Sequence, residues 1–301
     1  MRNKKAFLAI DIFYLCLLAA GPIFAIMLKV LFTPQSDDIN ISGALVFFTL
    51  RLPFFDLPIS ETQVNSWVVI WSVLWLCKYI THGISARGEM KRQIIAEWVV
   101  EKTKNLVKGN MGEYFAPFAP FVAAIMGLSA FSSLMTLIGL YPPTSDINTT
   151  AGWAILVFFL ITYYKFKCGP VHYLKSFGDP VPFLAPLNII SEFATPVSMA
   201  FRHYGNVLSG SVISVLVAVA LKGLSNLIFG KLPGILGSFP FLQIGIPAVL
   251  SVYFDIFSGL LQAFIFAMLT MLYVAGGFPA EDYAAKKAKR AAKKAKSKQN
   301  S

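Results

Sequence analysis

Long apolar runs dominate the pattern of hydrophobic and polar positions along this chain. A bilayer core of about 30 Å needs roughly 20 apolar residues per helix, and about six runs approach or exceed that length. They occupy residues 7–32, 67–80, 115–140, 153–164, 183–221 and 239–276, and the two shorter ones borrow flanking residues. Because the apolar residues form continuous runs and not amphipathic stripes, the pattern predicts an all-α integral membrane protein with about six membrane helices.

The fifth and sixth runs are too long for helices that cross a membrane upright. A helix over residues 183–221 would be about 58 Å long, almost twice the hydrocarbon thickness. We therefore expect each run either to break, with Pro196 as the candidate position in the fifth, or to lie strongly tilted. Two long tilted C-terminal helices with polar faces suit a surface that follows another curved object within the membrane.

The stretches between the runs predict two further elements. Residues 34–65 contain three prolines and are expected to form an extracytoplasmic loop with little regular structure. Residues 89–108 predict an amphipathic helix on the inner membrane face, with a soluble packing helix as the alternative. Its apolar positions, which stand among charged residues, are Ile94, Ile95, Trp98, Val99 and Leu106.

The first run lies within residues 1–33, behind a basic start, and has two interpretations. It is either a retained membrane helix that acts as a signal anchor or a cleaved signal peptide. The run is long, and no clear small-x-small cleavage site precedes Lys29. These features favour a retained helix.

Composition excludes a soluble domain, because 56% of the 301 residues are hydrophobic and only 14% are charged. The net charge of +11 is concentrated in the tail, where residues 286–298 hold eight lysines and arginines. We interpret this tail as a cytoplasmic extension that contacts anionic lipid, and expect no nucleic acid as a partner. Cys16, Cys77 and Cys168 show no close pairing, so neither a disulfide nor a metal site is expected.

The distribution of lysine and arginine predicts an orientation in the membrane. With the N-terminus in the cytoplasm and six spans, 21 basic residues fall on the cytoplasmic side and 4 on the outer side. Cytoplasmic loops carry the excess of positive charge, so both termini are expected to be cytoplasmic.

Charged residues inside the last two runs indicate function, since they are costly in a bilayer. The fifth run holds Glu192, Arg202 and His203, and the sixth holds Asp255 and Gln262. Arg202 lies about 20 residues from either end of its run, too far for its side chain to reach the headgroups easily. Its guanidinium stays protonated, so it must face protein, water or the carboxylate of a partner.

Helical spacing groups the polar residues of these two runs. Asn206 lies four residues after Arg202 and shares its face, as does Ser198 four residues before it. Asp255 and Gln262 are seven residues apart and lie on one stripe. Each run therefore presents a polar face.

Three motifs resemble the a subunit of F-type ATP synthase. The stretch PLNIISEFATPVSMAFRHYGNVLSG at 186–210 is similar to the sequence around that family's essential arginine, usually R-L-F-G-N and here R-H-Y-G-N at 202–206. The stretch LLQAFIFAMLTMLY at 260–273 resembles its last helix, and PPTSDINTT at 142–150 its P-[ST]-x-D-[LIV]-N-x-T loop. They occur in the family's order and cover roughly residues 65–277.

The resemblance implies a stator ion channel of the F0 sector, with two aqueous half-channels that meet near Arg202. Each carboxylate of the rotating c-ring would be drawn into its charged form beside Arg202, which would also block a direct leak. Asn206, Gln262, Glu192 and Asp255 match family positions that line the half-channels or orient the arginine. The resemblance thus makes residues 66–278 an ion-channel domain, flanked by the membrane helix 1–33, the loop 34–65 and the basic tail 279–301.

The implied partners are the c-ring, F0 subunit b, the F1 sector reached through the stator, and the lipid of a bacterial inner membrane. The resemblance implies no cofactor and no enzymatic activity of this chain alone, which contains no GxxxxGK[ST] phosphate loop. Proton transport is the expected activity, and the alternative of sodium depends on a carboxylate in another chain.

Two further candidate residues of the ion pathway, Ser211 and His203, depart from the family pattern. Ser211 stands nine residues after the arginine, where the family often has Glu or His, whereas Asp255 keeps the acid seven residues before the glutamine. His203 replaces the usual leucine after the arginine, and we favour a packing role for it over a titrating one.

A secondary transporter with a charged site at the membrane midplane is the alternative function. Such transporters usually show internal repeats between their halves. This chain shows none, and Arg202 has no counterpart in the first half. A purely structural stator protein would leave the cost of burying Arg202 and Asp255 without an explanation.

Overall fold

The computed structural model describes residues 4–33, 44–53, 56–85, 90–167, 169, 173, 177–178, 181–229, 245, 249–250, 252–278 and 283. Within them the chain is almost entirely helical. The helices are α1 (Lys4–Phe32), α2 (Glu61–Thr81), α3 (Lys91–Met111), α4 (Ala119–Leu134), α5 (Ile147–Lys167), α7 (Ala185–Phe229) and α10 (Gly259–Gly276). Shorter turns are η1 (Glu113–Phe118), η2 (Met135–Ile138), η3 (Pro143–Ser145), η4 (Pro182–Leu184) and the π-helical η5 (Val252–Ser258).

Six helical segments of the described chain are long and apolar enough to cross a membrane. In lipid, every backbone polar group must bond within its own segment, which is why these runs fold as helices. Large apolar side chains point outward from them: Val30 of α1 is 73% exposed and Phe159 of α5 is 65% exposed. Such an apolar exterior fits lipid contact and confirms an all-α integral membrane protein.

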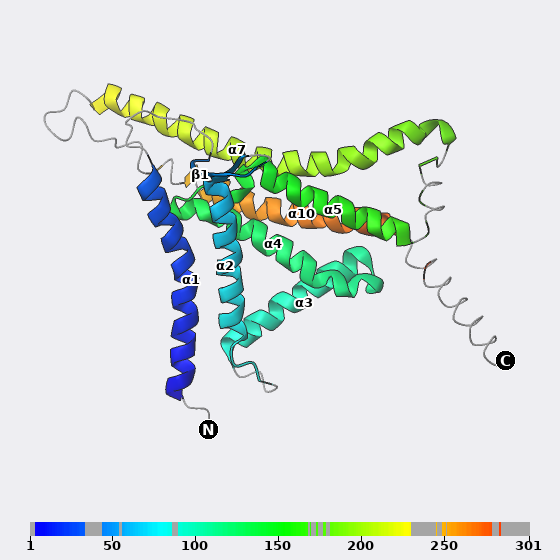
Figure 1. Ribbon diagram of the computed structural model, residues 1–301, viewed down its shortest axis with the longest axis horizontal. Helices are drawn as coiled ribbons and strands as arrows, with labels where there is room; N and C mark the ends of the chain where they lie inside the picture. The colour runs from blue at the N-terminus through cyan, green and yellow to red at the C-terminus, as the bar shows by residue number, and fades with distance from the viewer. Residues whose placement is uncertain are drawn as a thin grey trace.

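α7 resolves the length problem of the fifth run by tilting. It continues through Pro196 for 45 residues without a break. Figure 1 shows it as a shallow V that passes over the upper ends of α1 and α2 at a steep angle to both, with α5 and α10 below it. Of the sixth run, η5 and α10 are described, and most of residues 239–251 lie outside the described residues.

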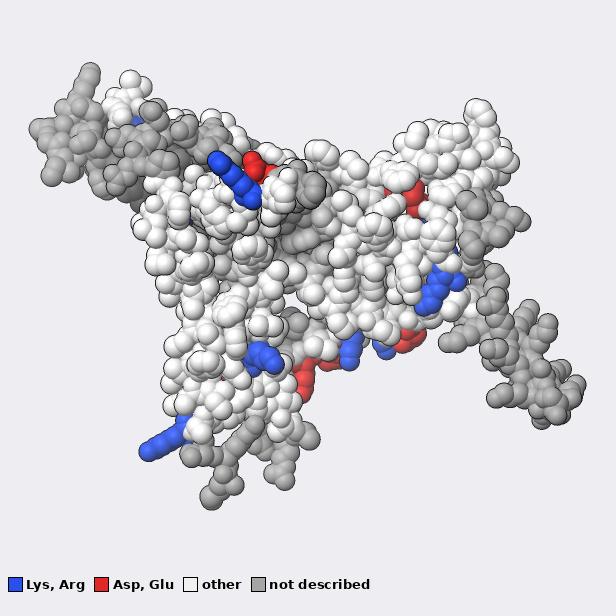
Figure 2. All heavy atoms as spheres, viewed as in Figure 1, with Lys and Arg blue, Asp and Glu red and all other residues white. Residues whose placement is uncertain are grey.

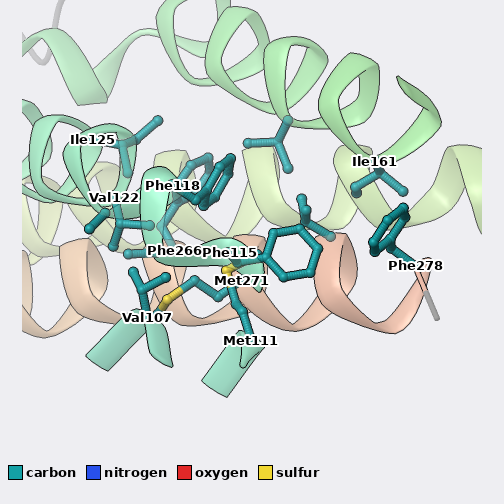
Figure 3. Packing of buried hydrophobic residues seen from close by; sticks show 14 of the residues in the cluster. Val107, Met111, Phe115, Phe118, Val122, Ile125, Ile161, Phe266, Met271 and Phe278 are labelled. Carbon is teal, nitrogen blue, oxygen red and sulfur yellow. The ribbon is translucent and has the colours of Figure 1, made fainter. Parts of the chain in front are cut away.

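The main core joins α3, η1, α4, α5 and α10, as Figure 3 shows. Its buried members include Val107, Phe115, Val122, Phe266 and Met271. α10 approaches α4 closely at Gly259, where an added Cβ would lie 2.5 Å from the Cβ of Ser133. Small residues allow this close approach of two membrane helices.

The expectation of little regular structure at 34–65 is wrong for its second half. Strands β1 (Val46–Arg51) and β2 (Asp56–Ser60) form an antiparallel hairpin, and α2 begins directly after it at Glu61. The segment Val46–Arg51 is rich in aromatic and β-branched residues, which favour strands. Phe47 and Ile59 also pack against Val64 of α2 in a small core of their own. Residues 34–43 lie outside the described residues.

α3 combines core packing with an exposed apolar surface. Val107 and Met111, near its end, are buried in the core, whereas Ile94 and Trp98 are 56% and 57% exposed. Figure 2 shows charged side chains gathered along the lower edge of this face, over α3, with a largely uncharged band above. This arrangement favours an interfacial helix, since the buried residues of α3 are confined to its two ends, with Gln93 in the first turn and Val107 and Met111 in the last turns.

α1 is attached to the rest of the protein by ion pairs near both of its ends. Near its start, Asp11 contacts His82 at 2.8 Å and Arg92 at 2.9 Å. Near its end, the Nζ of Lys29 lies 3.2 Å from the buried Glu61 and donates a hydrogen bond to the carbonyl oxygen of Gly139. The sequence analysis passed over Asp11, a charge inside the first apolar run. The basic tail, apart from Tyr283, lies outside the described residues, as does Cys168.

Candidate functional site

Arg202 lies near the middle of α7 and is exposed. It makes no ion pair or hydrogen bond within the part of the chain that the structure describes. Ser198 and Ser209 are exposed on the same face of α7 as Arg202. A Cβ added at Gly205, on this face, would meet nothing within 4 Å. The arginine therefore stands on an open surface of small residues, where a partner could approach the helix closely.

His203, the next residue, faces the protein interior. Its side chain is 0% exposed, and its Nε2 lies 3.2 Å from the hydroxyl of Ser129 on α4. The rings of Trp153 on α5 and Phe266 on α10 meet it edge to face at 5.8 and 5.6 Å. These contacts fix the rotation of α7 about its axis and support the packing role.

Asn206 connects α7 to the segment that leads into α10. Its Nδ2 donates to the hydroxyl of Ser258 at 2.8 Å, and the hydroxyl lies 3.1 Å from its Oδ1. One turn later, a Cβ at Gly210 would lie 3.2 Å from Phe254. Asp255 belongs to the same π-helical segment, η5, and is partly buried. Ser258 could not be predicted as a site residue, because only the tertiary structure brings it to Asn206.

Gln262 and Ser211 occupy different surroundings. Gln262 follows Ser258 by one helical turn and is 4% exposed. The hydroxyl of Ser211 donates to the backbone carbonyl of Leu208 on its own helix at 2.8 Å. The place of Ser211 in the ion pathway therefore stays a prediction.

Glu192 lies apart from this group, at the edge of a cavity of about 600 Å³ between α5, α7 and α10. Lys165, in the last turn of α5, reaches across the cavity, and its Nζ lies 2.5 Å from Glu192 Oε2. Burial, with the Glu192 carboxylate beside it, raises the pKa of the Tyr173 hydroxyl above its usual range. The sequence analysis counted Lys165 only as a topology charge, since nothing local links it to a residue 27 positions later.

A second cavity, of about 1020 Å³, lies at the other end of α5. It is lined by the β-hairpin, the start of α2, the first turns of α5, and Tyr204 and Leu208 of α7. Thr62 donates a hydrogen bond to Asp146 at 2.7 Å on its wall. The two cavities thus meet α7 on either side of Arg202 along the chain. Among the described residues, Asp255 and Gln262 line neither of them.

The sequence profile of the family described as ATP synthase A chain matches residues 63–275. The chain belongs to this family. All seven predicted site residues fall inside the matched region, and α1 and the basic tail fall outside it.

Curated relatives agree over most of the chain. An ATP synthase subunit a of Trichlorobacter lovleyi is 31% identical over 242 residues, which cover 77% of this chain and 94% of the relative. That of Desulforamulus reducens is 32% identical over 221 residues, covering 71% and 78%. That of Legionella pneumophila, strain Philadelphia 1, is 28% identical over 228 residues, covering 75% and 90%. The family assignment leaves the secondary-transporter alternative without support.

Proposed function

We propose that this chain is the stator ion channel of the F0 sector of a rotary ATP synthase, in a bacterial cytoplasmic membrane. The observation that carries the proposal is Arg202, a permanent cation exposed on α7 without a partner in the described chain. Such a charge is costly in lipid unless a partner carboxylate or water meets it. A ring of c subunits, each with one membrane carboxylate, supplies that partner.

Arg202 acts on each ring carboxylate as it arrives. In a medium of low dielectric, the attraction between guanidinium and carboxylate is strong, so the carboxylate gives up its proton beside Arg202. The arginine itself cannot take up that proton, because its guanidinium is already protonated. The same fixed charge repels protons and so separates the two half-channels.

The two cavities at opposite ends of α5 support two water-filled routes. In the orientation that the lysines and arginines predict, the cavity beside Lys165 and Glu192 belongs to the cytoplasmic route. The cavity bounded by the hairpin, Asp146 and Tyr204 lies on the outer side. Asn206, which bonds Ser258 of η5, and Gln262 and Asp255 of η5–α10 supply the polar groups of the outer route, with Asp255 at its outer end. In this assignment His203 does not carry ions.

The partners follow from the same arrangement. The stripe of Ser198, Gly205 and Ser209 around Arg202 faces the c-ring. Subunit b and, through it, the F1 sector hold the chain against the torque of the ring. Catalysis of ATP synthesis belongs to F1, and this chain is not an enzyme on its own. The transported ion is proposed to be the proton.

Site-directed cross-linking tests the orientation of this surface. In a background without Cys16, Cys77 and Cys168, a cysteine at Ser209 should form an oxidative cross-link with a cysteine on the outer helix of subunit c. A cysteine at Phe13, which is 57% exposed on α1, is the matched control and should not form this cross-link. Purification of the complex should also recover the ring and the soluble ATPase subunits. A cross-link at Phe13 but not at Ser209 would contradict the proposal.

A further inference from the structure

The Lys165–Glu192 pair is built more tightly than a surface ion pair. The side chains of Lys165 and Glu192 are 22% and 11% exposed, and Lys165 Nζ lies 2.5 Å from Glu192 Oε2. A Cβ at Gly277 would lie 2.9 Å from Lys165 Cε, so glycine at the end of α10 leaves the space through which the lysine passes. The ring of Tyr173 lies 5.8 Å from the same ammonium group. Three segments therefore hold Lys165 in one position.

Only one oxygen of Glu192 is used by this pair. Oε2 accepts from Lys165, whereas Oε1 is buried and makes no hydrogen bond to any described residue. A buried carboxylate oxygen without a donor is costly and needs water or another donor. The cavity of about 600 Å³ that Glu192 lines has room for water, and the residues around it include Asn188, Ser191 and Thr195.

We propose that Lys165 is a positioning residue of the cytoplasmic half-channel, which holds Glu192 turned so that Oε1 can exchange protons with water in the cavity. This inference rests on the proposed function. During synthesis, a proton released by a ring carboxylic acid passes through water to Glu192 Oε1, where an O–H bond forms. That bond then breaks as a cavity water takes the proton toward the cytoplasm. The steps reverse when ATP hydrolysis drives pumping.

The contact with Lys165 sets the direction in which the Glu192 carboxylate points. Because Oε2 is held by the ammonium group, Oε1 is the oxygen left for water in the cavity. The other titratable groups that line the cavity are Tyr173 and Tyr273. Without Lys165 the carboxylate would no longer be held in this direction, and its proton exchange with the cavity water would slow.

The test compares variants in inverted membrane vesicles that carry the whole synthase. ATP-driven proton uptake is followed by the quenching of an acridine dye, as a function of the pH on the cytoplasmic side. Lys165→Met should lower the rate roughly tenfold and change the shape of the rate–pH profile, because proton exchange at a misplaced Glu192 then limits the rate. Lys165→Arg should keep the rate and the profile near the wild type, because it keeps the cation that holds Glu192 Oε2.

Lys167→Met is the matched control. Lys167 lies in the same helical turn, but its ammonium group stands over the rings of Tyr114 and Tyr163, and it does not line the cavity. Its removal should leave the profile in place. If Lys165→Met does not assemble, Glu192→Gln tests the same acid and should lower the pumping rate to the same extent, because an amide cannot exchange the proton.

Two outcomes would overturn the inference. One is a wild-type rate and profile in Lys165→Met, and the other is a rate lowered by the same factor at every pH, which a merely structural tie between α5 and α7 would give. Arg202→Ala in the same vesicles separates this failure from that of the proposed function. If Arg202→Ala abolishes pumping while the Lys165→Met profile does not move, only the role of Lys165 is wrong. If Arg202→Ala pumps normally, the proposed function itself is wrong.

Discussion

Arg202 and His203 are adjacent in α7, but the arginine is exposed on the open surface of the helix and the histidine is completely buried beneath it. Successive side chains of a helix point about 100° apart, so one residue can fix the direction of the other. His203 is held by Ser129, Trp153 and Phe266 from three different helices. The buried residue therefore determines where the cation points.

The packing role of His203 predicts opposite results for two substitutions. His203→Leu, which restores the usual family residue, should keep coupled pumping, because leucine fills the site and leaves no buried Nδ1 without a partner. His203→Ala should lower the stability of the subunit by about 2–4 kcal/mol, since it leaves a cavity between helices. Thermal unfolding of the solubilised F0 sector and dye-based pumping measure the two effects. Loss of coupling in a stable His203→Leu protein would indicate that the imidazole carries protons.

The contact between Gly259 and Ser133 predicts a steric defect. Gly259→Ala places a Cβ 2.5 Å from the Ser133 Cβ and 2.7 Å from its Oγ, which forces α10 away from α4. Overpacking of this kind costs about 1–3 kcal/mol. Gly127→Ala in α4 is the control, since its Cβ would meet nothing within 4 Å. The measurement is the melting temperature of the purified complex, and equal melting temperatures for the two variants would refute the close contact.

The ion pairs of α1 predict that this helix remains in the mature protein. Lys29→Met should weaken its attachment and lower assembly, because it leaves the Glu61 carboxylate, 3% exposed, without its cation. Arg51→Met, at an exposed strand position, should have no effect. Intact-mass measurement of the purified subunit should include residues 2–33. A mature N-terminus after residue 30, together with normal assembly, would show that α1 is a cleaved signal peptide.

The position of Asp255 predicts a slower but still coupled channel when its charge is removed. Asp255→Asn should reduce the pumping rate several-fold without a proton leak, since Arg202 still separates the half-channels. A cysteine at position 255 should react with a membrane-impermeant thiol reagent from the outer side, in a background without the three native cysteines. Labelling only from the cytoplasmic side would reverse both the orientation and the channel assignment.

The sequence was sufficient for those features that depend on single segments. Apolar runs predicted the six membrane helices, because the length of a membrane helix is set by the bilayer. The cost of a permanent charge in lipid singled out Arg202 before any contact was known. The length of the fifth run predicted that α7 would break or tilt, and the structure shows the tilt.

The features that the sequence did not predict depend on contacts between distant segments. Lys165 meets Glu192, and Asp11 meets His82 and Arg92, only after the helices have packed. Residues 46–60 contain prolines and resembled a loop, yet the packing of Phe47 and Ile59 on α2 makes them a hairpin. The roles of Asp255 and Gln262 stay predictions, because the structure places them in neither cavity.

Arg202 allows the most direct test of the proposed channel. The measurement is ATP synthesis driven by an imposed proton gradient in vesicles that contain equal, verified amounts of assembled synthase. Arg202→Ala should abolish synthesis, and Arg202→Lys should restore little of it, because a buried lysine can lose its proton and lacks the planar fork. Synthesis by Arg202→Ala at a rate close to that of the wild type would contradict the account.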